Sequence, residues 1–319
     1  MKKIIITFIS SIFIIIGLAL IYLSLFGYET NRFNHYIFKE VEKVDKNLII
    51  NLDKIKIKLD VIKFDLFFST EKPKISYRKI DLPINSLKIY FDLKKLLKTK
   101  VYISRAIIDL NKFKIIDIQN LALTSKPSNI KSYILNNLSK GSIKSIIDLS
   151  FEENLKLINY TVNGNLIDTN IRLTKKLIIK KTNLNFESSK NFLQINSIKG
   201  NFQSIAINDG FIEIKKNNDY NAKGSLNFSI LSNNQKIKEL MQNISNSKIL
   251  NNNIEIKGDA TSNFSINLDK TLKVLNYNID INCEIDKSKI KFNNEIKNSF
   301  FKKNIKNISL KNLNLKINL

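Results

Sequence analysis

An uninterrupted apolar run opens the chain. The residues from Ile4 to Tyr28 include no charged side chain, and Lys2 and Lys3 precede them. At ~1.5 Å rise per residue, about 20 apolar residues in a helix cross a hydrocarbon core of ~30 Å. The pattern therefore predicts a transmembrane anchor over residues 1–29. A cleavable secretory signal is the competing interpretation, but it typically has an apolar core of only ~7–15 residues followed by small residues.

Beyond residue 45, apolar positions alternate with polar ones. Ile55, Ile57 and Leu59 are interleaved with lysines, which is the period-two pattern of a strand with one apolar and one wet face. The alternation recurs at intervals of roughly 8–14 residues, which predicts about seventeen short strands in an antiparallel meander. Polar turns are expected between them, such as Asn163 with Gly164, Asp209 with Gly210, and Asn217 with Asp219.

Three segments have helical spacing instead. One follows the membrane anchor directly, over residues 30–46. A second begins after Ser128, an N-cap residue, and is expected to stop by Gly141. A third begins after Asn234. The chain is therefore divided into an anchor (1–29), a juxtamembrane helix (30–46) and one β domain (47–319).

The predicted fold is mainly β, an N-terminal transmembrane helix followed by an elongated, twisted antiparallel sheet with a few short helices. One apolar sheet face has to be covered. A sandwich, a closed barrel and a gutter filled with lipid would each cover it. The chain has only 8 glycines, and tight barrel corners usually need more. This favours the gutter, or β-groove.

The chain is strongly basic, with a formal net charge of +24. Such a charge attracts an anionic membrane surface by ~1 kcal/mol per nearby Lys or Arg, although an A/T-rich coding sequence also enriches Lys, Asn and Ile. The sequence argues against nucleic acid, because the lysines are spread evenly and arginine, the residue that favours bidentate phosphate contacts, is scarce. The arginines are Arg32, Arg78, Arg105 and Arg172.

Catalytic chemistry has few candidate residues. His35 is the single histidine and Cys283 the single cysteine, which argues against a His/Cys metal site, and no phosphate-binding, nucleophile-elbow or zinc-protease motif is present. We therefore expect no enzyme activity, no metal and no cofactor. Cys283 alternates with isoleucines, which is typical of a small buried hydrophobe.

The order of elements in residues 84–113 carries a family resemblance. A strand (87–91) is followed by a short helical turn (92–97) and a second strand (101–109). Together with the N-terminal anchor, this order resembles the N-terminal region of the AsmA-like family, which includes YhdP- and TamB-type proteins. The resemblance implies a periplasmic β-groove, anchored in the inner membrane of a Gram-negative cell, that carries phospholipid acyl chains toward the outer membrane.

The charges flanking the anchor predict its orientation. Lys2 and Lys3 are expected to stay in the cytoplasm, because positive charge is retained there. The protein is then single-pass in the inner membrane, with its N-terminus cytoplasmic and its bulk periplasmic. The residues expected to line the lipid groove are Ile55, Ile57, Leu59, Leu87, Ile89, Phe91, Val101 and Ile103.

Two other functions remain open alongside phospholipid transport or outer-membrane homeostasis. The alternation continues through Leu313 to Leu319, so this edge is expected to meet further chain or a protein partner. A periplasmic scaffold or assembly factor for outer-membrane proteins would use such an edge by adding a strand to it. A cationic protein that binds glycan or membrane surfaces would instead bind more weakly as salt increases.

Overall fold

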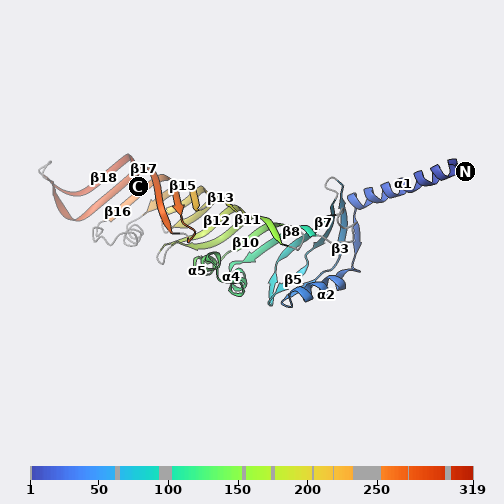
Figure 1. Ribbon diagram of the computed structural model, residues 1–319. Helices are drawn as coiled ribbons and strands as arrows, with labels where there is room; N and C mark the ends of the chain where they lie inside the picture. The colour runs from blue at the N-terminus through green and yellow to red at the C-terminus, as the bar shows by residue number, and fades with distance from the viewer. Residues whose placement is uncertain are drawn as a thin grey trace. The chain divides into compact units, whose positions relative to one another are not determined.

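The chain folds as a mainly β protein with an apolar N-terminal helix (Figure 1). In its described part, fifteen strands form one antiparallel sheet and three more form a small separate sheet. The predicted fold class is thereby confirmed. The computed structural model describes residues 2–61, 65–92, 103–152, 156–173, 177–202, 205–217, 219–232, 253–271, 273–298 and 303–318.

Strands that follow one another in the chain lie side by side in the large sheet. Its order is β1, β3, β4, β7, β8 and then β10 to β18, with β9 paired to β11. The chain forms two compact units. The first contains Met1–Phe113 and Ser145–Val162, and the second contains Lys114–Lys144 and Asn163–Leu319.

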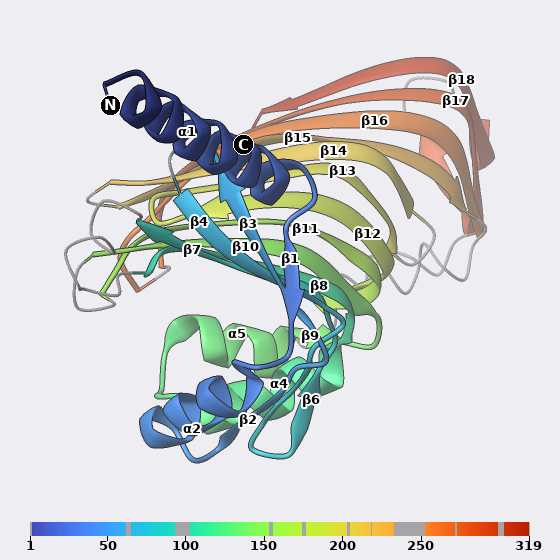
Figure 2. The same ribbon diagram turned by 90° about the vertical axis from the view of Figure 1, so that its right-hand side faces the viewer.

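In the first unit, the apolar helix leads directly into an edge strand of the large sheet. β1 pairs with β3, and β4, β7 and β8 follow in order. Figures 1 and 2 show β1 and β3 running across the axis of α1. The elements are α1 (Lys2–Leu25), β1 (Tyr28–Thr30), β3 (Ile55–Asp60), β4 (Asp65–Glu71), β7 (Ile84–Asp92) and β8 (Ile103–Lys114).

Gly27 makes the turn from helix to strand. Its φ is +75°, in the left-handed region that glycine adopts without strain. Its N–H donates to the carbonyl of Tyr22 at 3.1 Å, which closes the last turn of α1. Lys58 Nζ donates to the carbonyl of Leu25 at 3.2 Å. A cation from β3 thus satisfies a carbonyl at the negative end of the helix dipole.

A small sheet and a helix complete the first unit. α2 (Asn34–Val44) confirms a helix within the predicted juxtamembrane segment, although β1 precedes it. The small sheet consists of β2 (Leu48–Asn51), β5 (Lys74–Tyr77) and β6 (Ile80–Leu82). The Asn34 side-chain amide donates to the carbonyls of Leu52 and Asp53, and this ties the start of α2 to the segment before β3.

Two helices begin the second unit. α5 (Asn129–Asn137) confirms the predicted helix, and the Ser128 hydroxyl accepts a hydrogen bond from Lys131 N–H at 3.1 Å. The alternation of Phe113 and Ile115 predicts a strand that includes both residues, and the structure corrects this, because α4 (Ile115–Thr124) begins at Ile115. Gln119 of α4 donates to the carbonyls of Ile134, Leu135 and Leu138 at the end of α5, so the two helices satisfy each other's polar groups.

Long strands make up the rest of the second unit, and Figure 2 shows those from β12 to β18 curving in the same direction. β10 (Ser142–Phe151) and β11 (Leu157–Arg172) contribute residues to both units. The remaining strands are β9 (Leu138–Ser139), β12 (Ile178–Ser189), β13 (Phe192–Phe202), β14 (Ile205–Lys216), β15 (Tyr220–Ser232), β16 (Asn253–Leu268), β17 (Val274–Asn298) and β18 (Lys303–Asn318).

Several predicted turns are interior positions of these long strands. Asp209 and Gly210 lie within β14, and Asn163 and Gly164 lie within β11, so neither pair is a turn. In β14 the pairing with β15 shifts between Ile207 and Asp209, which is a β-bulge. The bulge adds one residue to β14. Ile205 and Ile207 before it and Ile212 and Ile214 after it therefore point to the same face, although the first two have odd numbers and the last two even numbers.

Two predicted elements cannot be compared with the structure. The helix after Asn234 and the helical turn at 92–97 lie outside the described residues, apart from Asp92 at the end of β7. The turn at Asn217 is confirmed, since its N–H donates to the carbonyl of Asp219 between β14 and β15.

Candidate functional site

The register of the first unit brings the predicted lining residues onto one face of the sheet. All of them except Val101, which lies outside the described residues, belong to β3, β7 or β8. Residues directly opposite each other on paired strands point to the same face. The apolar row of the first unit, named here the anchor-side row, consists of Tyr28, Ile57, Phe68, Ile89 and Ala106.

Burial separates the predicted lining residues into two groups. Ile55, Leu59 and Phe91 are buried, with 2%, 5% and 9% of their surface exposed. They belong to the protein's own core. The remaining residues are half-buried, so part of their apolar surface faces outward, and these are Ile57, Leu87, Ile89 and Ile103.

β4 contributes aromatic residues that the sequence interpretation did not select. Phe68 pairs in register with both Ile57 and Ile89, and its ring centroid lies 4.7 Å from that of Phe91. Its neighbour Phe67 points to the opposite face, where it stacks on Tyr90 at 5.1 Å. The run Leu66-Phe67-Phe68 does not alternate with polar residues, so only the pairing of β4 assigns each ring to a face.

The opposite face of the first unit holds an ion pair beside these rings. Arg105 Nε donates to Asp148 Oδ1 at 2.8 Å, and Arg105 Nη2 donates to Asp148 Oδ2. The guanidinium also lies over the Tyr90 ring, 5.5 Å from its centroid. The hydrogen bonds that Arg105 donates to Asp148 raise the pKa of Arg105, and burial raises the pKa of Tyr90. This cluster is polar and geometrically specific, and it positions β8 against β10.

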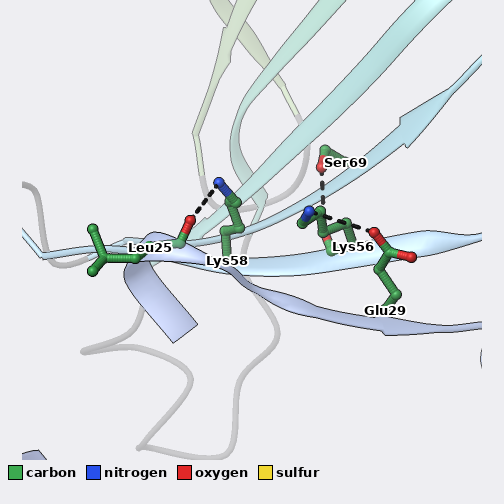
Figure 3. A network of polar contacts seen from close by, with 5 residues as sticks. All are labelled: Leu25, Glu29, Lys56, Lys58 and Ser69. Atoms are coloured by element: carbon green, nitrogen blue, oxygen red, sulfur yellow. Dashed lines mark hydrogen bonds and ion pairs between the residues drawn. The ribbon is translucent and has the colours of Figure 1, made fainter. Parts of the chain in front are cut away.

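Charged side chains surround the junction of α1 and the sheet (Figure 3). Lys58 reaches the carbonyl of Leu25, and Lys56 Nζ lies 3.4 Å from Glu29 Oε1. Ser69 Oγ donates to the carbonyl of Lys56 at 3.4 Å. These lysines alternate with Ile55, Ile57 and Leu59 along β3, so they lie on the face opposite the anchor-side row.

The second unit carries a longer apolar row. Six consecutive strands contribute to it, and each residue pairs in register with the next. Two rows of this kind run beside each other. The second-unit row consists of Gly200, Ile207, Phe228, Ala260, Cys283 and Leu315, and its neighbour consists of Phe202, Ile205, Ile230, Gly258, Ile285 and Leu313.

The second-unit row is most exposed at its β18 end. Ile207 is 5% exposed and Ala260 is 9% exposed, whereas Phe228 and Cys283 are half-buried and Leu315 is 40% exposed. Partial burial raises the pKa of the Cys283 thiol above its ordinary value. The outer part of this row therefore offers apolar surface that the described chain leaves partly uncovered.

The other face of the second unit is polar and joined across its strands by side-chain amides. Asn221 Nδ2 donates to Asn267 Oδ1 at 2.5 Å, and Asn267 Nδ2 donates to Asn276 Oδ1 at 2.7 Å. Thr261 Oγ1 donates to Asn227 Oδ1 on the same face. Such ladders hold the register, and the register keeps the two faces chemically distinct.

One described helix is long and apolar enough to cross a membrane. Its stretch Thr7–Leu25 has 19 residues, none of them buried in the protein, although an N-terminal signal sequence meets the same criteria. Within the described ranges, no three His, Cys, Asp or Glu residues are grouped in a way that could hold a metal ion. His35 is exposed on α2.

No family model, curated protein or solved structure shows significant similarity to this chain. The AsmA-like resemblance therefore remains a prediction from the sequence.

Proposed function

We propose that this protein is a membrane-anchored lipid-handling protein whose apolar sheet face holds phospholipid acyl chains. The observation that supports this most directly is the second-unit row, which crosses six strands without a charged residue and is most exposed at β18. The anchor-side row, joined to α1 through β1, offers the same chemistry next to a membrane helix.

Apolar contact of this kind suits movement of lipid along the sheet. Burial of acyl surface contributes about 25 cal/mol per Å² and has no directional requirement. The side chains of the rows differ in size but make only non-directional contacts with an acyl chain, so no directional bond would fix the chain at a single position. Lipid headgroups would stay in water while the acyl chains lie against the rows.

The proposed location follows from the anchor. With α1 in the bilayer, Lys2 and Lys3 favour a cytoplasmic N-terminus and an extracytoplasmic sheet. In a Gram-negative cell, the proposed orientation would put the apolar rows in the periplasm, and the proposed function is phospholipid transport between the inner and outer membranes. The resemblance to AsmA-like proteins supports this assignment.

Two adjacent phenylalanines on opposite faces provide the test. The full-length protein would be reconstituted with phospholipid that carries a photoreactive diazirine in its acyl chain, and adducts would be mapped by peptide mass spectrometry. We expect adducts near Phe68 and Ile89 in the first unit, and near Phe228 in the second. Phe68→Glu should reduce adduct yield on the anchor-side row several-fold.

Phe67→Glu is the matched control, because it also removes a half-buried ring but from the other face. It should leave the yield on the anchor-side row unchanged. Circular dichroism would verify that both variants fold. An absence of adducts on both apolar rows of a folded protein would contradict the proposed function.

A scaffold function is the second candidate, and the β18 edge favours it. In the described part of the chain, β18 pairs with β17 on one side and with no strand on the other. A client segment would add there as a further strand. A photoreactive amino acid at Asn314 should then yield protein crosslinks, whereas a lipid conduit predicts adducts of lipid at Leu315.

A further inference from the structure

A polar cavity lies beside the junction of the membrane helix and the sheet. Its volume is about 280 Å³, and it opens between β1, β3 and β4. It occupies the face opposite the anchor-side row, so it is separate from the proposed acyl surface. The cavity is lined by Glu29, Asp53, Lys54, Lys56, Ser69 and Glu71.

Charged side chains of both signs line this cavity, and only two of them form an ion pair with each other. Glu29 and Lys56 form an ion pair at 3.4 Å. Among the described residues, no cation pairs with the carboxylates of Asp53 or Glu71, and no acid pairs with Lys54. Three carboxylates and two ammonium groups leave one excess negative charge. A zwitterion with its cationic end among the carboxylates complements this arrangement.

The cavity walls are held in place by hydrogen bonds that do not depend on a ligand. The Asn34 amide donates to the carbonyls of Leu52 and Asp53 at 2.8 and 2.9 Å, and this fixes the segment that carries Asp53. Ser69 Oγ donates to the carbonyl of Lys56. β1, β3 and β4 are joined by continuous pairing. The backbone that carries the lining residues is therefore in place before a ligand binds, whereas the side chains of Glu29, Asp53, Lys54 and Glu71 are exposed to solvent.

The position of the cavity indicates what occupies it. α1 has 24 residues, so at 1.5 Å rise per residue it extends about 36 Å and exceeds a hydrocarbon core of ~30 Å. Glu29 follows the end of α1 by four residues, on a strand that runs across the helix axis (Figures 1 and 2). With α1 in the bilayer, the cavity then lies at the level of the lipid headgroups.

We propose that this cavity binds the headgroup of a bilayer phosphatidylethanolamine. The primary ammonium donates hydrogen bonds to Asp53 and Glu71, and the phosphate lies against Lys54 and Lys56. The trimethylammonium of phosphatidylcholine has no N–H to donate, and anionic phosphatidylglycerol meets the excess negative charge. The bound lipid keeps its acyl chains in the bilayer, so it holds the first strands at the surface. This inference requires α1 to span the membrane but does not require acyl chains on the apolar rows.

Native mass spectrometry of the full-length protein in detergent tests the assignment. The protein would be titrated with phosphatidylethanolamine, phosphatidylcholine and phosphatidylglycerol that carry identical acyl chains, so that acyl contacts cancel in the comparison. We expect phosphatidylethanolamine to bind at least about fivefold more tightly than the other two. The double variant Asp53→Asn, Glu71→Gln should remove this preference.

Glu284→Gln is the control, because Glu284 is an exposed carboxylate on β17 in the second unit and does not line the cavity. It should keep the full preference. Equal binding of the three lipids, or an unchanged preference in the double variant, would overturn the proposal. If soluble phosphoethanolamine binds as tightly as the lipid, the claim that the ligand is a bilayer lipid would be wrong, since the site would then bind a free metabolite equally well. The total amount of phospholipid that stays bound to the protein tests the apolar rows, and the preference among headgroups tests the cavity. The two proposals can therefore fail independently.

Discussion

At the scale of single residues, Gly27 determines how the membrane helix joins the sheet. A Cβ at this position would lie 2.7 Å from Lys58 Cγ and 2.8 Å from the carbonyl oxygen of Ile57, and the φ of +75° strains any other residue. Gly27→Ala should therefore lower the free energy of unfolding by about 1–2 kcal/mol. Thermal unfolding of the full chain in detergent measures the change.

Gly17→Ala is the matched control for this prediction. A Cβ at Gly17 has no heavy atom within 4 Å, and the backbone there is helical. The variant should unfold at the wild-type temperature or slightly above it. Equal destabilisation of both variants would show that the junction has no special requirement for glycine.

Arg105 is a second residue whose geometry matters more than its charge. Its guanidinium makes two hydrogen bonds to Asp148 and lies over Tyr90. Arg105→Lys keeps the positive charge but loses the bidentate contact, and we expect a loss of about 1 kcal/mol because the pair is only partly exposed. Chemical denaturation provides the measurement. Arg172→Lys, at an exposed position on β11, should change nothing, and an equal effect of the two would contradict this account.

At the scale of elements, the turn between β16 and β17 should respond to acid. Asp269 Oδ1 accepts hydrogen bonds from the N–H groups of Thr271 and Lys273 and from the Thr271 hydroxyl. These bonds lower the pKa of Asp269 below its ordinary value of 3.8. The carboxylate therefore stabilises the turn above its ordinary pKa, and this contribution is lost as pH falls through the lowered pKa.

Exchange of the Lys273 amide hydrogen reports on this turn. Relative to the pH dependence of intrinsic exchange, its protection should fall as pH drops below the ordinary Asp value. Asp269→Asn keeps an acceptor oxygen but cannot titrate, so its protection should not vary with pH in that range. A wild-type protection that is equally flat would remove Asp269 as the cause.

At the scale of the whole molecule, the single cysteine reports on the apolar surface. Cys283 lies in the second-unit row, and burial raises its pKa, so less of the reactive thiolate is present at neutral pH. Alkylation should be slower than that of a free thiol and should accelerate as pH rises toward the raised pKa. Phospholipid that covers the row should slow it several-fold further.

Moving the cysteine by one residue gives the control. In the double variant Cys283→Ser, Asn282→Cys, the thiol lies on the polar face at an exposed position. Lipid should not change its rate of alkylation. Equal slowing at both positions would indicate general shielding by lipid or detergent and would argue against acyl chains on the apolar row.

The sequence by itself determined those features that depend on neighbouring residues. The apolar run predicted α1, alternation predicted an antiparallel β fold, and Ser128 predicted the start of α5. It also predicted that Ile57 and Ile89 lie on an apolar face. The face to which a strand residue points and the hydrogen bond at a helix cap both depend on residues only a few positions apart. Both can therefore be predicted from the sequence.

Only the tertiary structure decided which apolar residues are covered and where strands continue. Ile55 and Ile57 have the same local pattern, yet 2% of Ile55 is exposed while Ile57 is half-buried, because burial depends on elements far away in the chain. Asp209 and Gly210 have the composition of a turn, but pairing with β15 keeps them in a bulged strand. Ile115, Ile118 and Ala122 have helical spacing. Ile115 also continues the alternation of the preceding strand, so the local pattern alone does not show where the strand ends and the helix begins. The cavity at Glu29 joins residues from β1, β3, β4 and the segment before β3, and no local pattern marks such a site.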